Sequence, residues 1–260
     1  MYNDLFTIGR ITIHGYGLMT GIGIVMAYLD ADHRAKKAPK ERMLDSDYIL
    51  SLFIFCLLFG YLAAKILYWI TILPQIIQNP RILLDISDGF VVYGGIIGGL
   101  LTVVVYCKRK KLPIFSYMDH LFPSVALAQG FGRIGCFLAG CCYGNETSGS
   151  CYIMFSHSDF APNGIHLIPT QLISSGLDFL NYFVLILLAK RNKVSGRIAA
   201  FYLIFYSAGR FVIEFFRGDL IRGSVGALST SQFISIFVAA LGVVMLVLLG
   251  KKGNSAKEEE

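Results

Sequence analysis

Long apolar segments alternate with short polar segments along the whole chain. Each apolar segment approaches the roughly 20 residues that a helix needs to cross a lipid bilayer. One such segment alone is also compatible with a buried helix of a soluble protein, but a series of seven is not. The pattern therefore predicts an all-α, polytopic membrane helix bundle with about seven transmembrane helices. The predicted spans are residues 15–31, 47–70, 90–106, 117–137, 170–189, 198–216 and 231–249.

The composition agrees with this pattern. Of the 260 residues, 55% are hydrophobic and 15% are charged, and the mean hydropathy is +0.62. Soluble domains carry about 25% charged residues, so this chain has too few polar side chains to cover a water-exposed globule of its size. We expect one transmembrane domain, residues 1–250, and a short disordered cytoplasmic tail, residues 251–260.

The basic residues predict the orientation in the membrane. Most of the 23 lysines and arginines lie in four short segments that follow the first, third, fifth and seventh spans. Positively charged loops stay in the cytoplasm, so we expect the N-terminus outside and the C-terminus inside. Residues 138–168 then form an external head loop. The basic segments are 34–42, 108–111, 190–197 and 251–257.

This distribution also explains the net charge of +6. The basic side chains lie next to apolar spans, where they can contact anionic membrane lipids. They form no basic face with interleaved aromatic residues, so we expect no nucleic-acid partner.

We single out four ionisable residues within or at the ends of predicted spans: Lys65, Arg133, Arg210 and Glu214. A charge at bilayer depth costs about 2.5–3.5 kcal/mol on insertion scales, so it indicates a polar cavity. Arg210 and Glu214 are four residues apart and can pair on one helical face; a purely structural ion pair remains the alternative. Arg133 has no carboxylate within four residues, so its partner must come from another span or from a ligand.

Arg133 and Arg210 together suggest an anion site. A guanidinium group offers a rigid fork of donors that suits a phosphate and stays charged at physiological pH. Two of them near the outer end of a glycine-rich bundle are suited to hold a phospholipid headgroup, whereas snorkelling to the interface is the alternative. Glycine runs at 21–25, 94–99 and 130–144 favour either a cavity or tight helix packing.

Tyr93 directly precedes one of these glycine runs. Its hydroxyl can donate to a phosphate or exchange a proton with a substrate, and a place in an aromatic belt at the membrane surface is the alternative.

Four of the six cysteines lie close together in the sequence. Cys136, Cys141, Cys142 and Cys151 fall within sixteen residues near or in the head loop. Their spacing is not a standard zinc spacing, so we expect no metal site. A disulfide such as Cys142–Cys151, small packing thiols, and a covalent or redox role all remain open.

Six ordered motifs together resemble the prolipoprotein diacylglyceryl transferases of bacteria over nearly the whole chain. Arg133, Arg210 and Glu214 fall on that family's arginines and glutamate. The chain departs from the family pattern at several polar positions, namely Tyr93 for a histidine, Cys136, Ala139 and Cys141 for asparagines and a glutamate, Ile168 for a histidine and Ser174 for a glutamate. The motifs are IHGYGLM (13–19), VVYGGIIGG (91–99), GRIGCFLAG (132–140), PTQL (169–172), YSAGRFVIEFFR (206–217) and SQFIS (231–235).

The resemblance implies a transferase of the bacterial plasma membrane. Such an enzyme moves the diacylglyceryl group of phosphatidylglycerol to the thiol of a lipobox cysteine in a secreted prolipoprotein, forms a thioether and releases glycerol phosphate. Because the polar positions are replaced, two alternatives stay open. One is a family paralogue that uses another acceptor, and the other is a non-catalytic lipid-binding or transport protein.

The resemblance also implies roles for particular residues. Tyr93, Arg210 and Glu214 are the expected catalytic residues. Tyr93 is the preferred base because Glu214 is expected to pair with Arg210. No cofactor and no metal is expected. The residues expected to bind phosphatidylglycerol are Arg133, Tyr16, Gly94, Gly95 and Gly135.

Overall fold

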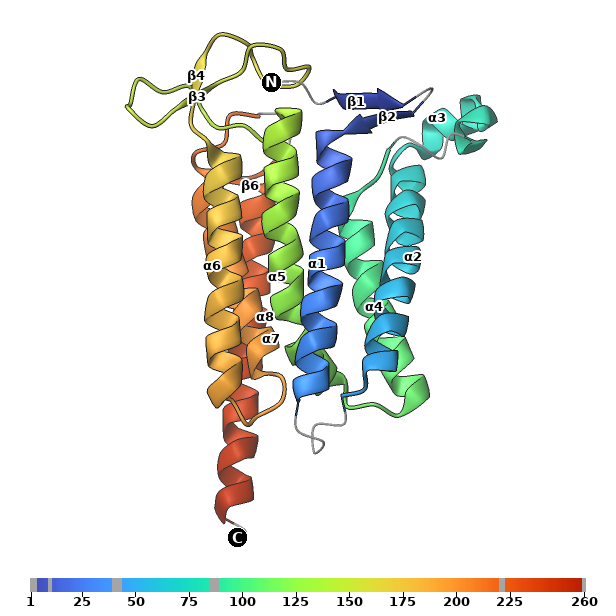
Figure 1. The fold of residues 1–260 in the computed structure, drawn as a ribbon, viewed down its shortest axis with the longest axis vertical. Coiled ribbons are helices and arrows are strands. Elements are labelled where there is room, and N and C mark those ends of the chain that lie inside the picture. The colour runs from blue at the N-terminus through green and yellow to red at the C-terminus, as the bar shows by residue number, and fades with distance from the viewer. Residues whose placement is uncertain (1–3, 9–10, 39–43, 85–88, 220–222, 259–260) are drawn as a thin grey trace. The chain divides into compact units, whose positions relative to one another are not determined.

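The computed structural model describes residues 4–8, 11–38, 44–84, 89–219 and 223–258 (Figure 1). These residues form two compact units. The larger unit comprises Met1–Ala31 and Met118–Glu260, and the smaller comprises Asp32–Tyr117.

Most of the described chain is α-helical, which confirms the predicted all-α class. Seven of the helices coincide with the seven predicted spans to within a few residues, apart from longer C-terminal ends of α1 and α8. The helices are α1 (Gly15–Lys37), α2 (Ser46–Thr71), α3 (Leu73–Gln78), α4 (Val92–Lys110), α5 (Ile114–Ala139), α6 (Thr170–Arg191), α7 (Arg197–Glu214) and α8 (Thr230–Glu258), with a 3₁₀ helix at Pro80–Leu84. Three antiparallel pairs of short strands complete the structure: β1 (Asp4–Ile8) with β2 (Ile11–His14), β3 (Ile153–Met154) with β4 (His166–Leu167), and β5 (Ser224–Val225) with β6 (Leu228–Ser229).

Five described helices are long and apolar enough to cross a membrane: α2, α4, α5, α6 and the Thr230–Gly250 part of α8. α7 carries three charged residues in its 18 residues, and α1 is rich in glycine and ends in charged residues, so neither meets the same criterion. The total of seven spans stays a prediction. Large apolar side chains such as Leu58, Phe183 and Phe237 point outward, as expected of helices that face lipid.

α8 runs on to Glu258, into residues 251–260, for which we predict a disordered tail. That prediction and the prediction of a single domain over residues 1–250 remain to be tested.

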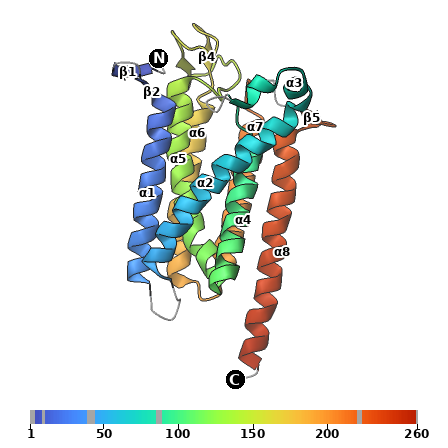
Figure 2. The ribbon, with the colours of Figure 1, turned by 90° about the vertical axis from the view of Figure 1, so that its right-hand side faces the viewer.

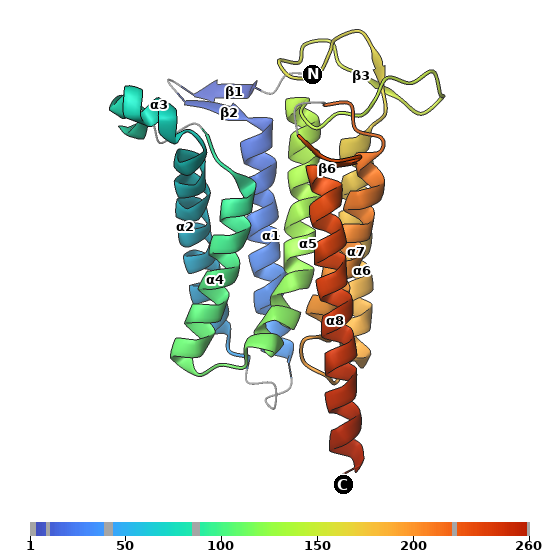
Figure 3. The ribbon, with the colours of Figure 1, turned by 180° about the vertical axis from the view of Figure 1, so that it is seen from behind.

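The larger unit packs its helices around a core shared by α5, α6 and α7 (Figure 3). Ala126, Leu185, Ile198 and Tyr202 are its buried residues. The carboxylate of Asp119 on α5 accepts hydrogen bonds from the backbone N–H groups at the start of α7, at 2.7 and 2.8 Å. A carboxylate at a helix N-terminus satisfies free donors and complements the helix dipole, so this contact fixes α7 against α5.

The head loop joins α5 to α6 and has a small core of its own. Phe155, Ala161 and Leu167 are buried there, with Phe137 and Tyr143 packed against them. The loop lies at the same end of these helices as the β1–β2 hairpin (Figure 1). The segment between α5 and α6 comprises residues 140–169, and the predicted limits 138–168 and external location of the loop stay predictions.

The smaller unit is built on the antiparallel pair α2 and α4 (Figure 2). Glycines let the two backbones approach closely. A Cβ atom added at Gly94 would lie 2.5 Å from the Ala63 carbonyl oxygen, and one added at Gly98 would lie 2.5 Å from the Ala63 Cβ. Tight packing therefore accounts for part of the glycine run 94–99.

Candidate anion-binding site

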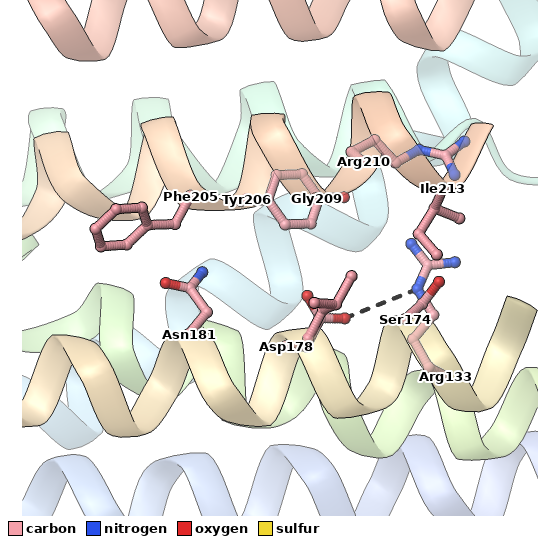
Figure 4. Close-up of a pocket in the computed structure, with 10 residues that line it drawn as sticks. Arg133, Ser174, Asp178, Asn181, Phe205, Tyr206, Gly209, Arg210 and Ile213 are labelled. Atoms are coloured by element: carbon pink, nitrogen blue, oxygen red, sulfur yellow. Dashed lines mark ion pairs between the residues drawn. The ribbon is translucent and has the colours of Figure 1, made fainter. Parts of the chain in front are cut away.

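A polar pocket lies between α6 and α7, and α5 contributes one side chain to it (Figure 4). On α6, Ser174, Asp178 and Asn181 follow one another at intervals of four and three residues, so they share one face of the helix. Tyr206 and Arg210 are likewise one turn apart on α7. Each helix thus presents polar side chains to the other in an otherwise apolar bundle.

Arg133 enters the same pocket from α5. Its Nε lies 3.9 Å from Oδ2 of Asp178, and the Arg133 and Asp178 side chains are largely buried. Of the two sources expected for a partner of Arg133, another span or a ligand, the structure shows the first. Because Arg133 and Arg210 line one pocket, the structure brings together the two arginines that the sequence singled out.

Asp178 is not among the four ionisable residues that the sequence singled out, and the structure adds it to the site. The signal was an acidic residue within an apolar span, four residues after Ser174. Ser174 and Asp178 both line the pocket. Asp178 thus places a carboxylate on this face of α6, one helical turn after Ser174.

Arg210 makes two contacts at the α7 end of the pocket. Its Nη2 lies 2.8 Å from Oε2 of Glu214, which confirms the predicted pair, and donates a hydrogen bond of 2.8 Å to the Ser231 hydroxyl in the SQFIS motif. Glu214 Oε2 has no hydrogen-bond partner within the described part of the chain, so the contact with Arg210 is close but not aligned as a hydrogen bond. The pair is therefore mainly electrostatic.

The side-chain amide of Asn181 is a further polar group of the pocket. Its side-chain nitrogen and oxygen are both buried and have no hydrogen-bond partner among the described residues, although Asn181 lines the pocket. Leaving a buried polar group unpaired costs about 1–3 kcal/mol, so such groups often serve a ligand. The cavity has a volume of about 30 Å³, which is more than the roughly 10–15 Å³ that one water molecule needs on the same measure. A phosphate therefore requires the side chains around it to move apart.

The chain reverses sharply at the end of α5. The backbone N–H of Gly140 donates to the Phe137 carbonyl and that of Cys141 donates to the Cys136 carbonyl, both at 3.1 Å. Gly140 has φ +76°, a conformation that glycine adopts without strain. These are the two bonds of a Schellman motif, which brings the third residue before the helix end into contact with the second residue after it. Those residues are Cys136 and Cys141.

Cys142 adds a third sulphur to this pair. It has φ +59°, and the Sγ atoms of Cys136, Cys141 and Cys142 all lie within 4.8 Å of one another. All six cysteines are free thiols, so the structure contains no Cys142–Cys151 disulfide. The spacing of the cysteines did not indicate this cluster, because only the helix end brings the thiols together.

The PTQL motif holds the reversed segment in place. The Thr170 hydroxyl donates to the Cys142 carbonyl and the Gln171 amide donates to the Cys141 carbonyl, each at 2.9 Å. Thr170 and Gln171 are 1% exposed. The first turn of α6 thus fixes the backbone that carries two of the three thiols.

Arg217 places a positive charge near the three thiols. It pairs with both carboxylate oxygens of Asp219, at 2.8 and 2.6 Å. Burial opposes the charge of Arg217, but hydrogen bonds to Asp219 and Cys142 raise its pKa above the ordinary value. Hydrogen bonds from the thiols of Cys136 and Cys141, followed by the charges of Arg217 and Arg133, lower the pKa of Cys142 although burial opposes the shift.

The remaining predicted site residues are not among those that line this pocket. Gly135 packs against α1, because a Cβ atom there would lie 3.1 Å from the Tyr16 carbonyl oxygen. Tyr16 itself is half exposed. Tyr93, Gly94 and Gly95 belong to α4 in the smaller unit. Their roles in binding or catalysis, and those of Tyr16 and Gly135, stay predictions.

The fold and the pocket together indicate the class of protein to which this chain belongs. The chain is a multi-pass membrane protein with an arginine-lined pocket among its helices. The sequence model described as "Prolipoprotein diacylglyceryl transferase" matches residues 3–248, and this chain belongs to that family.

Curated relatives extend this result over almost the full length. The chain is 48% identical over 239 residues to the phosphatidylglycerol–prolipoprotein diacylglyceryl transferase of Clostridium tetani (strain Massachusetts / E88), covering 92% of this chain and 94% of the relative. It is 42% identical over 249 residues to the phosphatidylglycerol–prolipoprotein diacylglyceryl transferase 2 of Clostridium perfringens (strain 13 / Type A), covering 95% of this chain and 95% of the relative. It is also 31% identical over 261 residues to the Staphylococcus xylosus protein, covering 98% of this chain and 92% of the relative.

Proposed function

We propose that this chain transfers the diacylglyceryl group of phosphatidylglycerol to the thiol of a lipobox cysteine in a prolipoprotein. The carbon–oxygen bond between the glycerol carbon and the phosphate breaks, and a carbon–sulphur bond forms. The leaving group is glycerol phosphate, and the thiol proton passes to a base. The names of the relatives at 48% and 42% identity support this reaction.

The observation that carries the proposal is the pocket shared by Arg133 and Arg210. Negative charge grows on the phosphate oxygen as the carbon–oxygen bond breaks. Two guanidinium groups in a site with little water stabilise that charge more in the transition state than in the ground state. Asn181 supplies an amide that has no partner in the segments that the structure describes and can hydrogen-bond to the headgroup.

The base must accept a proton from the acceptor thiol. Tyr93 is our first candidate, because Glu214 is already engaged by Arg210 at 2.8 Å. Asp178, which lies beside Arg133 in the pocket, is a further candidate from the structure. The distribution of basic segments supports a plasma-membrane enzyme with its N-terminus outside and its head loop on the external face.

The test is lipid transfer by the full-length protein in liposomes that contain phosphatidylglycerol. A synthetic peptide with a lipobox cysteine is the acceptor, and mass spectrometry detects the diacylglyceryl thioether. We expect product with this peptide, and none when serine replaces its cysteine or when phosphatidylglycerol is omitted. Absence of thioether from correctly inserted protein would contradict the proposal.

A matched pair of variants tests the role of the pocket. Arg133→Gln should lower transfer about 100-fold or more, because removing one preorganised donor costs about 10²–10³ in rate. Arg109→Gln removes an exposed arginine at the end of α4 and should leave transfer unchanged. Equal rates for the two variants would remove Arg133 from the mechanism.

A further inference from the structure

We propose that the thiols of Cys136, Cys141 and Cys142 bind one zinc ion at the end of α5. Their Sγ atoms lie within 4.8 Å of one another, and they are the one such group among the described residues. Zinc–sulphur bonds of about 2.3 Å in a tetrahedral arrangement place sulphurs about 3.8 Å apart. The thiols therefore need to close by at most about 1 Å, which side-chain rotation can supply.

The backbone that carries the thiols is already held in place. The Schellman motif at Gly140 holds Cys136 next to Cys141. Side chains in the first turn of α6 donate hydrogen bonds to the backbone carbonyls of Cys141 and Cys142. A site whose ligands are positioned before the metal arrives loses little conformational freedom on binding. This rigidity distinguishes the cluster from cysteines that merely lie close in sequence.

The type of ligand favours a soft metal. All three donors are sulphur, a set that suits zinc or copper(I) and not magnesium or calcium. Zinc in such a site has three protein ligands and leaves a fourth position for water or an external thiol. Cys136 is buried, and Cys141 and Cys142 are half-buried.

The charges around the three thiols favour the zinc-bound form of the site. Three thiolates and one zinc ion carry a net charge of −1. Arg217 hydrogen-bonds to Cys142, and Arg133 acts on the same thiol through its charge. Cations beside an anionic metal centre stabilise it, as hydrogen bonds to ligating atoms do in other metal sites. Arg217 is in turn held by Asp219.

The inference goes beyond the transfer reaction, and its test does not depend on that reaction. Full-length protein in detergent is freed of metal by a chelator under reducing conditions and then equilibrated with zinc or with cobalt(II). We expect one zinc per chain by elemental analysis, and a thiolate-to-cobalt charge-transfer absorption. Cys136→Ser and Cys142→Ser should each weaken zinc binding at least about tenfold.

Cys151→Ser and Cys56→Ser are the matched controls, because Cys151 is exposed in the head loop and Cys56 lies on α2. Both should keep one zinc per chain. Wild-type protein gives a second readout without any variant, since zinc should slow alkylation of Cys141 and Cys142 by a maleimide but not that of Cys151.

Three results would overturn the proposal. The first is wild-type protein that binds no zinc and shows no cobalt–thiolate absorption although its thiols are reduced. The second is zinc that persists in Cys136→Ser and Cys142→Ser alike. The third is the recovery of copper(I) as the one metal that binds. Failure of lipid transfer would leave the zinc result intact, because metal content is measured without lipid or acceptor.

Discussion

Replacing Glu214 by glutamine removes one charge from a buried ion pair and leaves the other. The Arg210 and Glu214 side chains are 13% and 6% exposed, and their atoms approach to 2.8 Å. Removing one partner of a buried pair costs about 3–5 kcal/mol, because it leaves an uncompensated charge in a medium of low dielectric. We therefore expect Glu214→Gln and Arg210→Gln each to lower the free energy of unfolding by about this amount.

The double variant separates structure from catalysis. Arg210→Gln with Glu214→Gln leaves no unpaired charge, so it should lose no more stability than either single variant. Lipid transfer should nevertheless stay low in the double variant, because the positive charge that faces the phosphate is gone. A purely structural pair would instead recover transfer together with stability.

The assay combines two measurements on the same preparations. Denaturation by SDS in mixed micelles, followed by circular dichroism, gives the unfolding free energy, and mass spectrometry of the acceptor peptide gives transfer. Asp4→Asn is the control, because it breaks an exposed pair with His14 of 2.6 Å, worth about 0–1 kcal/mol. If Glu214→Gln is no less stable than Asp4→Asn, or if the double variant is fully active, the reasoning is refuted.

Two further substitutions test the packing and the pocket. Gly144→Ala would place a Cβ 2.5 Å from the Ile168 carbonyl oxygen and should lower the unfolding free energy by about 1–3 kcal/mol through overpacking. In Gly176→Ala the new Cβ meets nothing within 4 Å, so this control should be neutral or stabilising by up to about 1 kcal/mol. Equal unfolding free energies for the two variants would contradict this packing. Asn181→Leu removes the unpaired amide, so it should preserve or raise the unfolding free energy while weakening phosphatidylglycerol binding in a liposome assay. Unchanged lipid binding would show that Asn181 does not contact the headgroup.

The sequence predicted the helices well, because a membrane span is a local property. Some 20 apolar residues form a helix in lipid whatever their neighbours, since every backbone group must be satisfied within the segment. The predicted spans 47–70 and 170–189 accordingly differ from α2 and α6 by at most two residues at either end. The pair Arg210–Glu214 was predictable for the same reason, as both residues lie on one helix turn.

The sequence alone could not predict which residue pairs with Arg133 or which thiols lie together. Asp178 meets Arg133 only because α5 and α6 pack side by side in the larger unit. Cys136 and Cys141 meet because Gly140 ends α5 in a left-handed turn, and Cys142 joins them through a second residue of positive φ. Helix periodicity relates residues three or four apart, whereas contacts between helices and at helix ends depend on packing and on turn geometry. The sequence by itself determined which segments are helices, and only the tertiary structure decided which charges and sulphurs face each other.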